Sequence, residues 1–423
     1  MIKRIGLVVV MICFLGGCYN YEELNSIAII SAIGIDHKDG EFRVSYQIVN
    51  SNNASNNTGY EQASVVVYDY PAKSLEESAR EASLLTSKRL FASHARVVVI
   101  SEEVARNYLP EVMDFIYRNP DIRNEFYMVM TKGNSPSDVL KVMTPLVNIS
   151  GEDIANSLIN SNEIMGINES VMFSELLNKY LNPRWDVVMP SIEIINSRDN
   201  RGKNISNISD SDRGNNNNRD AKDIDKSEKD MEGESTENLK KSDYDANILI
   251  STMGVFRGSE FLGFLTEEES ISYNFITGNL NKTLIEYECD DNKFVVLDII
   301  KIKSGMDVLK DGKISVKIRG RASIAETHCR MDLRDEKVIM RINKRLNERI
   351  EGMVKKSFYS IRDKYKSDIF GIEDMYYKKM NGYYKTVKRD WDEYFRNIEI
   401  EVESDVNLFS KGNGLGGIYE VEN

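Results

Sequence analysis

The sequence predicts a multidomain protein of the α+β or mixed α/β class, in which mixed sheets pack against helices. A chain of 423 residues with 41% apolar side chains can bury more than one core, and chains of this length usually divide into domains. In the first half, short apolar runs with strand alternation are interleaved with runs of helical spacing. In the second half, several strand patterns precede one long amphipathic helix pattern.

The first half begins with alternating apolar runs that predict strands of one sheet, over 26–36, 42–49 and 64–70. Ser74 and Glu77 then have the spacing of a capping box, which predicts a helix that begins after Ser74. The apolar run over 96–100 predicts a buried strand after that helix. These segments together predict a strand–helix–strand unit.

The rest of the first half continues the alternation of helices and strands. Ser101, Pro110 and Ser135 are residues that favour the first positions of a helix, and each precedes a run with helical spacing. Two more strands are expected over 126–131 and 187–195, and two more helices over 154–159 and 171–180. We therefore expect a mixed α/β region over residues 18–198, with a subdivision near residue 150 left open.

Composition changes abruptly between residues 199 and 243, where Asn, Ser, Asp, Lys and Glu leave almost nothing to bury. Such a composition predicts a disordered linker. As a flexible coil it would span about 35–40 Å from end to end. The expected division of the chain after this linker is a C-terminal α+β domain over 244–410 and a flexible tail over 411–423.

The second half predicts an antiparallel meander followed by a helix that packs across one face of the sheet. The meander's strands are expected over 246–256, 263–265, 284–289, 294–302 and 313–324. The helix carries apolar residues at three- and four-residue steps, at Ile342, Leu346, Ile350, Val354 and Ile361. A further helix over 384–395 and a last strand over 398–406 are expected to complete the domain.

The first eighteen residues have the layout of a bacterial export signal. A basic start is followed by the apolar run Ile5–Phe14 and by Leu15-Gly16-Gly17-Cys18, which resembles the lipobox of bacterial lipoproteins. The apolar run is much shorter than the ~20 residues that a membrane-spanning helix needs. We expect residues 1–17 to be cleaved between Gly17 and Cys18, and Cys18 to carry acyl chains such as palmitate that anchor the protein.

The net charge limits the kinds of binding partner that the chain can have, and the cysteine content limits the disulfides that it can form. A net charge of −12 and a pI near 5.1 argue against a nucleic-acid partner and against electrostatic adhesion to anionic lipid. Of the four cysteines, Cys13 leaves with the signal and Cys18 is acylated, so only Cys289 and Cys329 remain in the folded part. Nothing in the sequence brings these two together, which favours separate thiols over a disulfide but leaves the disulfide open.

No motif for catalysis, a cofactor or a metal stands out. The three histidines, His37, His94 and His328, are far apart and in no metal-ligand spacing. Residues 412–417 match Gly-x-Gly-x-x-Gly, but only six residues follow, too few for the helix that would receive a pyrophosphate. His94 precedes an apolar strand, where a structural role is favoured over a contact with a partner. We therefore expect no enzyme activity and no cofactor.

Several segments together resemble the Ger(x)C family, the lipoprotein C subunits of the nutrient receptors that trigger germination of bacterial spores. The resemblance covers nearly the whole mature chain except the linker. Its most specific part is the opening, Tyr21-Glu22-Glu23-Leu24-Asn25-Ser26-Ile27-Ala28. Other matching segments are Ile33–Asp36, Val44–Asn50, Arg89–Ile100, Asp114–Arg123, Val255–Gly258, Leu262–Leu265, Asp368–Gly371 and Trp391.

The resemblance implies a non-enzymatic subunit of unusual α/β domains. It implies that Cys18 anchors the chain to the outer leaflet of the spore's inner membrane, beside two multi-spanning receptor subunits. Whether this subunit itself contacts the small-molecule germinant is left open. Two alternative functions are a solute-binding lipoprotein that delivers a small ligand to a transporter and an envelope hydrolase. No motif in the sequence supports the hydrolase.

Overall fold

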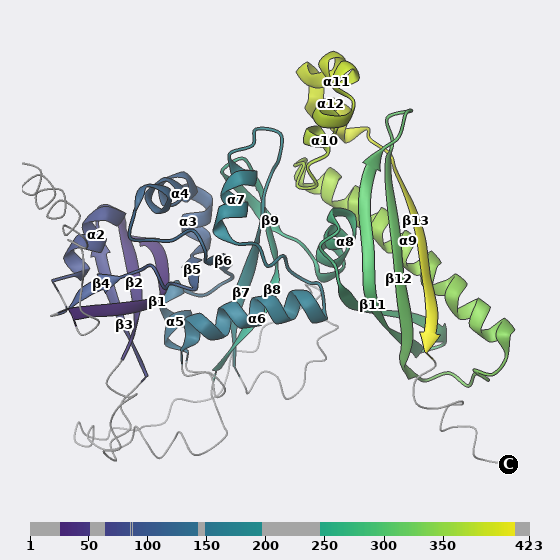
Figure 1. Cartoon of the computed structure of the whole chain (residues 1–423), viewed down its shortest axis with the longest axis horizontal. Helices are drawn as coiled ribbons and strands as arrows, with labels where there is room; N and C mark the ends of the chain where they lie inside the picture. The colour runs from purple at the N-terminus through teal and green to yellow at the C-terminus, as the bar shows by residue number, and fades with distance from the viewer. Residues whose placement is uncertain are drawn as a thin grey trace, which may run out of the picture.

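The structure is a computed structural model that describes residues 26–50, 64–84, 86, 88–142, 149–196 and 246–410. Within these residues, a nine-stranded mixed sheet and a four-stranded mixed sheet follow one another along an elongated molecule, each packed against helices (Figure 1). The predicted α+β, multidomain class with mixed sheets is confirmed. The signal peptide with Cys18, the linker over 199–243 and the tail over 411–423 lie outside the described residues and stay predictions.

The first sheet begins with the three strands that the sequence predicts, joined antiparallel: β1 (Ile27–Lys38), β2 (Glu41–Val49) and β3 (Val65–Ala72). Asp39 and Gly40 both have positive φ, of 57° and 86°, in the two-residue turn between β1 and β2. Turns of this kind match the twist of a hairpin. The turn places Lys38 opposite Glu41 and so sets the pairing of β1 with β2.

The strand–helix–strand unit is also confirmed, with α2 (Leu75–Ala82) and β5 (Val97–Ile100), and β5 lies parallel to β1. Ser74 caps α2 and accepts a hydrogen bond from the backbone N–H of Glu77. The Glu77 carboxylate bonds to the N–H of Lys73 at 2.9 Å. A three-residue strand that sequence analysis missed, β4 (Arg89–Phe91), pairs with the start of β1.

The remaining elements of the first half occur where the sequence predicts them. β6 and β7 extend the parallel part of the sheet, and every residue of β5 and β6 is buried because helices cover both faces. The elements are α3 (Glu102–Asn107), α4 (Leu109–Arg118), β6 (Tyr127–Thr131), α5 (Pro136–Lys141), α6 (Ser150–Ile164), α7 (Phe173–Tyr180) and β7 (Val188–Asn196).

Two strands after the linker belong to the first sheet, which corrects the predicted C-terminal meander. β8 (Ala246–Arg257) pairs antiparallel with β7, and β9 (Glu260–Phe264) pairs with β8. The chain leaves the sheet at Asn196 and returns beside it at Ala246, since these residues are paired. Alternation predicts a strand but not its neighbour. The domain boundary at 244 stays a prediction.

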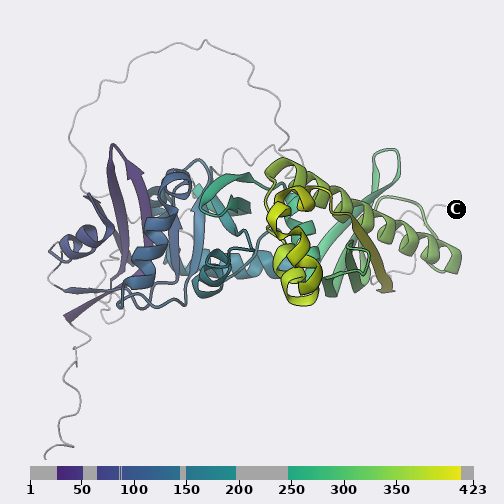
Figure 2. The ribbon, with the colours of Figure 1, turned by 90° about the horizontal axis from the view of Figure 1, so that it is seen from above.

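The second sheet is formed by β10 (Lys282–Asp290), β11 (Lys293–Val308), β12 (Ile314–Thr327) and β13 (Ile400–Ser410). The first three are antiparallel, as predicted. β13 joins β12 in parallel, because the long helical connection returns the chain to the same end of the sheet. The predicted helix, α9 (Glu336–Tyr365), packs across one face (Figures 1 and 2).

The helix α8 (Glu267–Thr277) of the second half was not predicted. It begins with a complete capping box, in which Thr266 and Glu269 exchange hydrogen bonds of 3.2 and 2.9 Å. Every residue from Glu269 to Ile276 is buried. Because neighbours surround α8, it lacks the one-sided apolar stripe by which a helix is found in a sequence.

Between α9 and β13 the chain forms a protruding group of short helices, seen at the top of Figure 1. One of them, α10 (Ile372–Lys379), was not predicted. The single helix expected over 384–395 is divided into α11 (Asn381–Val387), a 3-10 turn η5 (Lys388–Asp390) and α12 (Trp391–Arg396). Among the described residues, no helix is both long enough and apolar enough to cross a bilayer.

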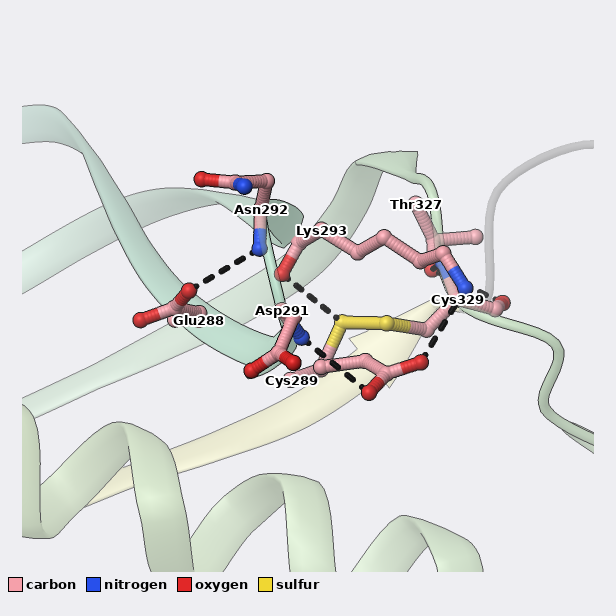
Figure 3. Close-up of a disulfide and its surroundings, with 8 residues drawn as sticks. Glu288, Cys289, Asp291, Asn292, Lys293, Thr327 and Cys329 are labelled. Carbon is pink, nitrogen blue, oxygen red and sulfur yellow. Dashed lines mark hydrogen bonds and ion pairs between the residues drawn. A yellow bond between two sulfur atoms is a disulfide. The ribbon is translucent and has the colours of Figure 1, made fainter.

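Cys289 and Cys329 form a disulfide, so the prediction of separate thiols is wrong (Figure 3). Cys289 is near the end of β10 and Cys329 follows β12, with 6.5 Å between the two Cα atoms. β11 lies between these strands, so their nearness depends on the sheet topology, which spacing does not show. A crosslink over a separation of 40 residues stabilises a fold by about 4 kcal/mol in the chain-entropy account.

Candidate functional site

The candidate site is the junction of the two halves, which we define as the loop 181–187 of the first half, α8, and the loop 366–371 that follows α9. One apolar core crosses it, because Val188, Met253 and Val255 of the first sheet share a buried cluster with α8, α9 and the second sheet. The two halves are therefore packed against each other over side chains that water does not reach.

The carboxylate of Asp186 is the polar centre of the junction. Its Oδ1 accepts a hydrogen bond from the backbone N–H of Gly258, in the turn between β8 and β9, at 2.8 Å. Its Oδ2 accepts from the Ser367 hydroxyl at 2.9 Å and from the N–H of Asp368 at 3.0 Å. The N–H of Asp186 donates in return to the Asp368 carbonyl at 3.2 Å. One side chain thus joins three segments.

Trp185 packs directly on the loop that Asp186 holds. Its indole Nε1 donates to the Ile369 carbonyl at 3.2 Å. Gly371, with φ of 73°, lies so close that a Cβ added there would come within 2.7 Å of ring carbons of Trp185. Only glycine meets both requirements at this position, since side chains disfavour positive φ.

Asp368 is a buried carboxylate in the same junction. It accepts backbone N–H bonds from Ile372 at 3.0 Å and Glu373 at 2.7 Å, at the start of α10. Burial raises the pKa of Asp368 to about 7; these two backbone bonds act in the opposite direction, and the nearby Asp186 carboxylate adds to the rise. The group therefore changes charge near neutral pH.

A second set of polar contacts lies between α7 and α8. Glu169 is buried and accepts from Lys179 Nζ at 2.6 Å, Asn279 Nδ2 at 2.8 Å and the Tyr273 hydroxyl at 3.1 Å. Burial raises the pKa of Tyr273 well above its usual range, so Tyr273 stays a donor. Asn274 of α8 donates to carbonyls of the loop before α7, which adds rigidity.

A cleft of about 520 Å³ opens beside these contacts. Its walls come from both halves: the loop before α7, α7 and Trp185 on one side, and the end of α8, β11 and Phe370 on the other. Clefts of this size between domains are the usual place for small-molecule sites.

The histidines do not form a centre in the structure. His37 stacks on Tyr108 at 3.9 Å, His94 is exposed beside Phe91, and His328 pairs with Glu326 at 2.7 Å. Within the described ranges, no group of three His, Cys, Asp or Glu side chains could hold a metal. The carboxylates of the junction accept hydrogen bonds from backbone and side-chain donors, and these bonds join the segments of the two halves.

Cys18, the site residue that the sequence predicts, lies outside the described residues. No local pattern of the sequence indicates Trp185, Asp186 or Glu169 as site residues. The segment Asp368–Gly371 was noticed only through the family resemblance. The partners of Asp186 are 72 and 182 positions away in the chain, so no local spacing reveals them.

Two family models of known proteins match the chain. Residues 20–194 match the model of the spore germination protein N-terminal domain, and residues 251–412 match the model described as spore germination B3/GerAC like, C-terminal. Asp186 lies in the first match and Asp368 in the second. The junction therefore joins the two family domains.

Relatives match over nearly their whole length. Spore germination protein KC of Bacillus subtilis (strain 168) is 24% identical over 97% of this chain and 97% of that one. Spore germination protein B3 of the same organism is 19% identical over 95% and 96%. The crystal structure of the GerBC protein is similar with a TM-score of 0.51 at 14% identity, over 89% of this chain and 96% of that chain. The last likeness supports the fold.

Gly371→Ala is expected to lower the free energy of unfolding by about 2–4 kcal/mol, because the new methyl group meets the Trp185 ring and the backbone keeps a positive φ. Gly382→Ala is the matched control: it lies in α11 with no atom within 4 Å of an added Cβ. It should be neutral or stabilise by up to about 1 kcal/mol. Equal effects in urea unfolding would refute the close packing of Trp185.

Because the pKa of Asp368 is raised in the folded chain, we expect the stability of the junction to fall as pH rises. Its pKa is higher in the folded chain, about 7, than its ordinary value of 3.8, so the folded state retains the proton that the unfolded state has lost. The stabilisation that is present below pH 4 is lost between pH 4 and pH 7, by up to about 4 kcal/mol. The difference in unfolding free energy between the native chain and Asp368→Asn should shrink over that window. A difference that stays constant with pH would contradict the assignment.

Proposed function

Because this chain belongs to the family of spore germination proteins of the GerAC type, we propose that it is a lipid-anchored, non-catalytic subunit of a membrane receptor that starts spore germination in response to nutrients. The observation that carries the proposal is the match of both family domains, on either side of the linker, in one chain. The resemblance of its opening residues to Ger(x)C proteins agrees with it.

The anchor would be Cys18. The spacing of the basic start, the apolar run and Leu15-Gly16-Gly17-Cys18 supports export and acylation. Two or more acyl chains, at about 0.8 kcal/mol per buried methylene, hold a protein stably on a bilayer. The chain would then stay on the outer face of the spore's inner membrane and assemble there with two multi-spanning subunits.

A non-catalytic role is supported by how the polar groups of the junction are used. Asp186 and Glu169 each accept three hydrogen bonds from neighbouring donors. A carboxylate that acts as a general acid or base must exchange its proton with a substrate. Carboxylates that several neighbouring donors engage in this way support the contact between the halves instead.

The cleft at the junction favours one second candidate, a solute-binding lipoprotein that delivers a small ligand to a transporter. The two functions differ in their partners. A receptor subunit should co-purify with two multi-spanning proteins from detergent-solubilised spore membranes, whereas a solute-binding protein should co-purify with a transporter permease.

The test uses an epitope-tagged full-length chain in spores. Cys18→Ala is expected to reduce the membrane-bound fraction by about tenfold or more, since the acyl chains are lost, and to slow the germination response. Cys13→Ala is the matched control, because it changes a cysteine of the signal's apolar run without changing the acylation site, and it should behave as the native chain.

Intact-mass analysis of the N-terminal peptide accompanies both variants. A native peptide that begins at Cys18 and carries a diacylglyceryl group supports the proposal. Normal membrane retention of Cys18→Ala, or a native chain whose Cys18 carries no lipid, would refute the anchor.

A further inference from the structure

The cleft at the junction has walls from both halves and a charged rim. α7 contributes Glu175 and Lys179, the loop after α7 contributes Trp185, and the second half contributes Phe370, Met306 and Met375. The proposed function leaves the occupant of this cleft unassigned. Its chemistry, residue by residue, indicates what it can bind.

Lys179 provides a cation with donors to spare. Its ammonium group donates to the Glu169 carboxylate at 2.6 Å, and 21% of the Lys179 side-chain surface is exposed. An ammonium has three N–H donors. In the part of the chain that the structure describes, Glu169 is the one hydrogen-bonding partner of Lys179. The other donors of Lys179 are therefore free for an anionic group in the cleft.

The buried pair also fixes the position of this cation. Asn279 and Tyr273 also donate hydrogen bonds to Glu169, at 2.8 and 3.1 Å. A ligand anion at Lys179 would meet an ammonium that is already held in place, so little side-chain entropy is lost when the anion binds.

Glu175 provides a carboxylate one helical turn before Lys179. It lines the cleft, its side chain is exposed, and no described residue forms an ion pair or hydrogen bond with its carboxylate. Residues four apart on a helix have Cβ atoms about 6 Å apart. A free anion and a partly free cation thus lie side by side at the rim.

The remaining lining combines polar side chains with apolar, polarisable ones. The rings of Trp185 and Phe370 and the thioethers of Met306 and Met375 line the cleft. Such side chains adapt to aliphatic groups of varied shape.

We propose that this cleft binds a small zwitterion with an apolar side chain, in the chemical class of the free α-amino acids. The ligand carboxylate bonds to Lys179 Nζ, the ligand ammonium bonds to the Glu175 carboxylate, and the side chain contacts Trp185, Phe370 and the two methionines. The site consists of residues of the cleft alone and is independent of the receptor assignment.

Binding in this cleft would stabilise the contact between the halves. The ionic groups come from the first half, and Phe370 and Met306 come from the second. A ligand that needs both walls binds the closed junction and not the separated halves, so it raises the stability of the junction by mass action.

The experiment uses the fluorescence of Trp185 in the full-length chain, purified in detergent micelles. The sequence has two tryptophans, so Trp391→Phe leaves Trp185 as the single reporter. Nε1 of Trp391 has no hydrogen-bond partner, and its replacement by Phe therefore removes none. The probes are L-valine, L-leucine and L-methionine, with 4-methylpentanoate and 3-methylbutylamine as leucine analogues that lack the ammonium or the carboxylate.

The expected result is a saturable change in Trp185 fluorescence with at least one of the amino acids. Each leucine analogue should bind about tenfold more weakly than leucine or worse, because one charge-assisted hydrogen bond is lost. Glu175→Gln should weaken amino-acid binding by a similar factor. Glu393→Gln, an exposed helical glutamate of α12 away from the cleft, is the matched control and should bind as the parent does.

Lys179→Gln would leave the buried Glu169 carboxylate without its cation and destabilise the fold. Glu175→Gln is therefore the variant that tests the site. Absence of a saturable response to all three amino acids, or unchanged affinity in Glu175→Gln, would overturn the site. Amino-acid binding by a chain that co-purifies with no multi-spanning subunit would support the site and count against the receptor assignment. Co-purification without binding would do the reverse.

Discussion

The structure depends most on one carboxylate, that of Asp186, which holds two halves of the chain in one arrangement. Its three hydrogen bonds reach the β8–β9 turn and the loop after α9, at 2.8, 2.9 and 3.0 Å. Bonds to a charged acceptor are stronger than neutral ones and cost more when lost. Because Asp186 bonds to Ser367 and Asp368, the neighbouring Trp185 packs against Gly371. The same loop places Phe370 on the opposite wall of the cleft.

The same arrangement connects the fold with the proposed function. An acyl group at Cys18 would place the first half on the membrane, while the second sheet, closed by the Cys289–Cys329 disulfide, extends from the other side of the junction. Anything that changes the junction would therefore change the position of one half relative to the other. The proposed ligand in the cleft and the charge of Asp368 would both act at this point.

Local signals predicted most elements of the fold, and long-range contacts account for what was missed. Ser101, Pro110 and Ser135 marked helix starts, and the spacing of Ile342, Leu346 and Ile350 marked α9, because capping and amphipathic patterns depend on near neighbours. β8 and β9 belong to the first sheet because β8 pairs with β7, which precedes it by about fifty residues in the chain. α8 is buried on all sides and carries no stripe. The partners of Asp186 and of Cys289 are set by topology. Cys18 is the one site residue that a local motif predicts, and it lies outside the described residues.

Amide hydrogen exchange at Gly258 and Asp368 is the most direct measurement of the central claim, because both amides donate to Asp186. In Asp186→Ala the two amides should lose protection together, by about tenfold or more. The amide of Val99 in the buried strand β5 should keep its rate, as evidence of an intact first sheet. If Gly258 and Asp368 keep their protection in the variant, Asp186 does not hold the halves together, and the account of the junction is wrong.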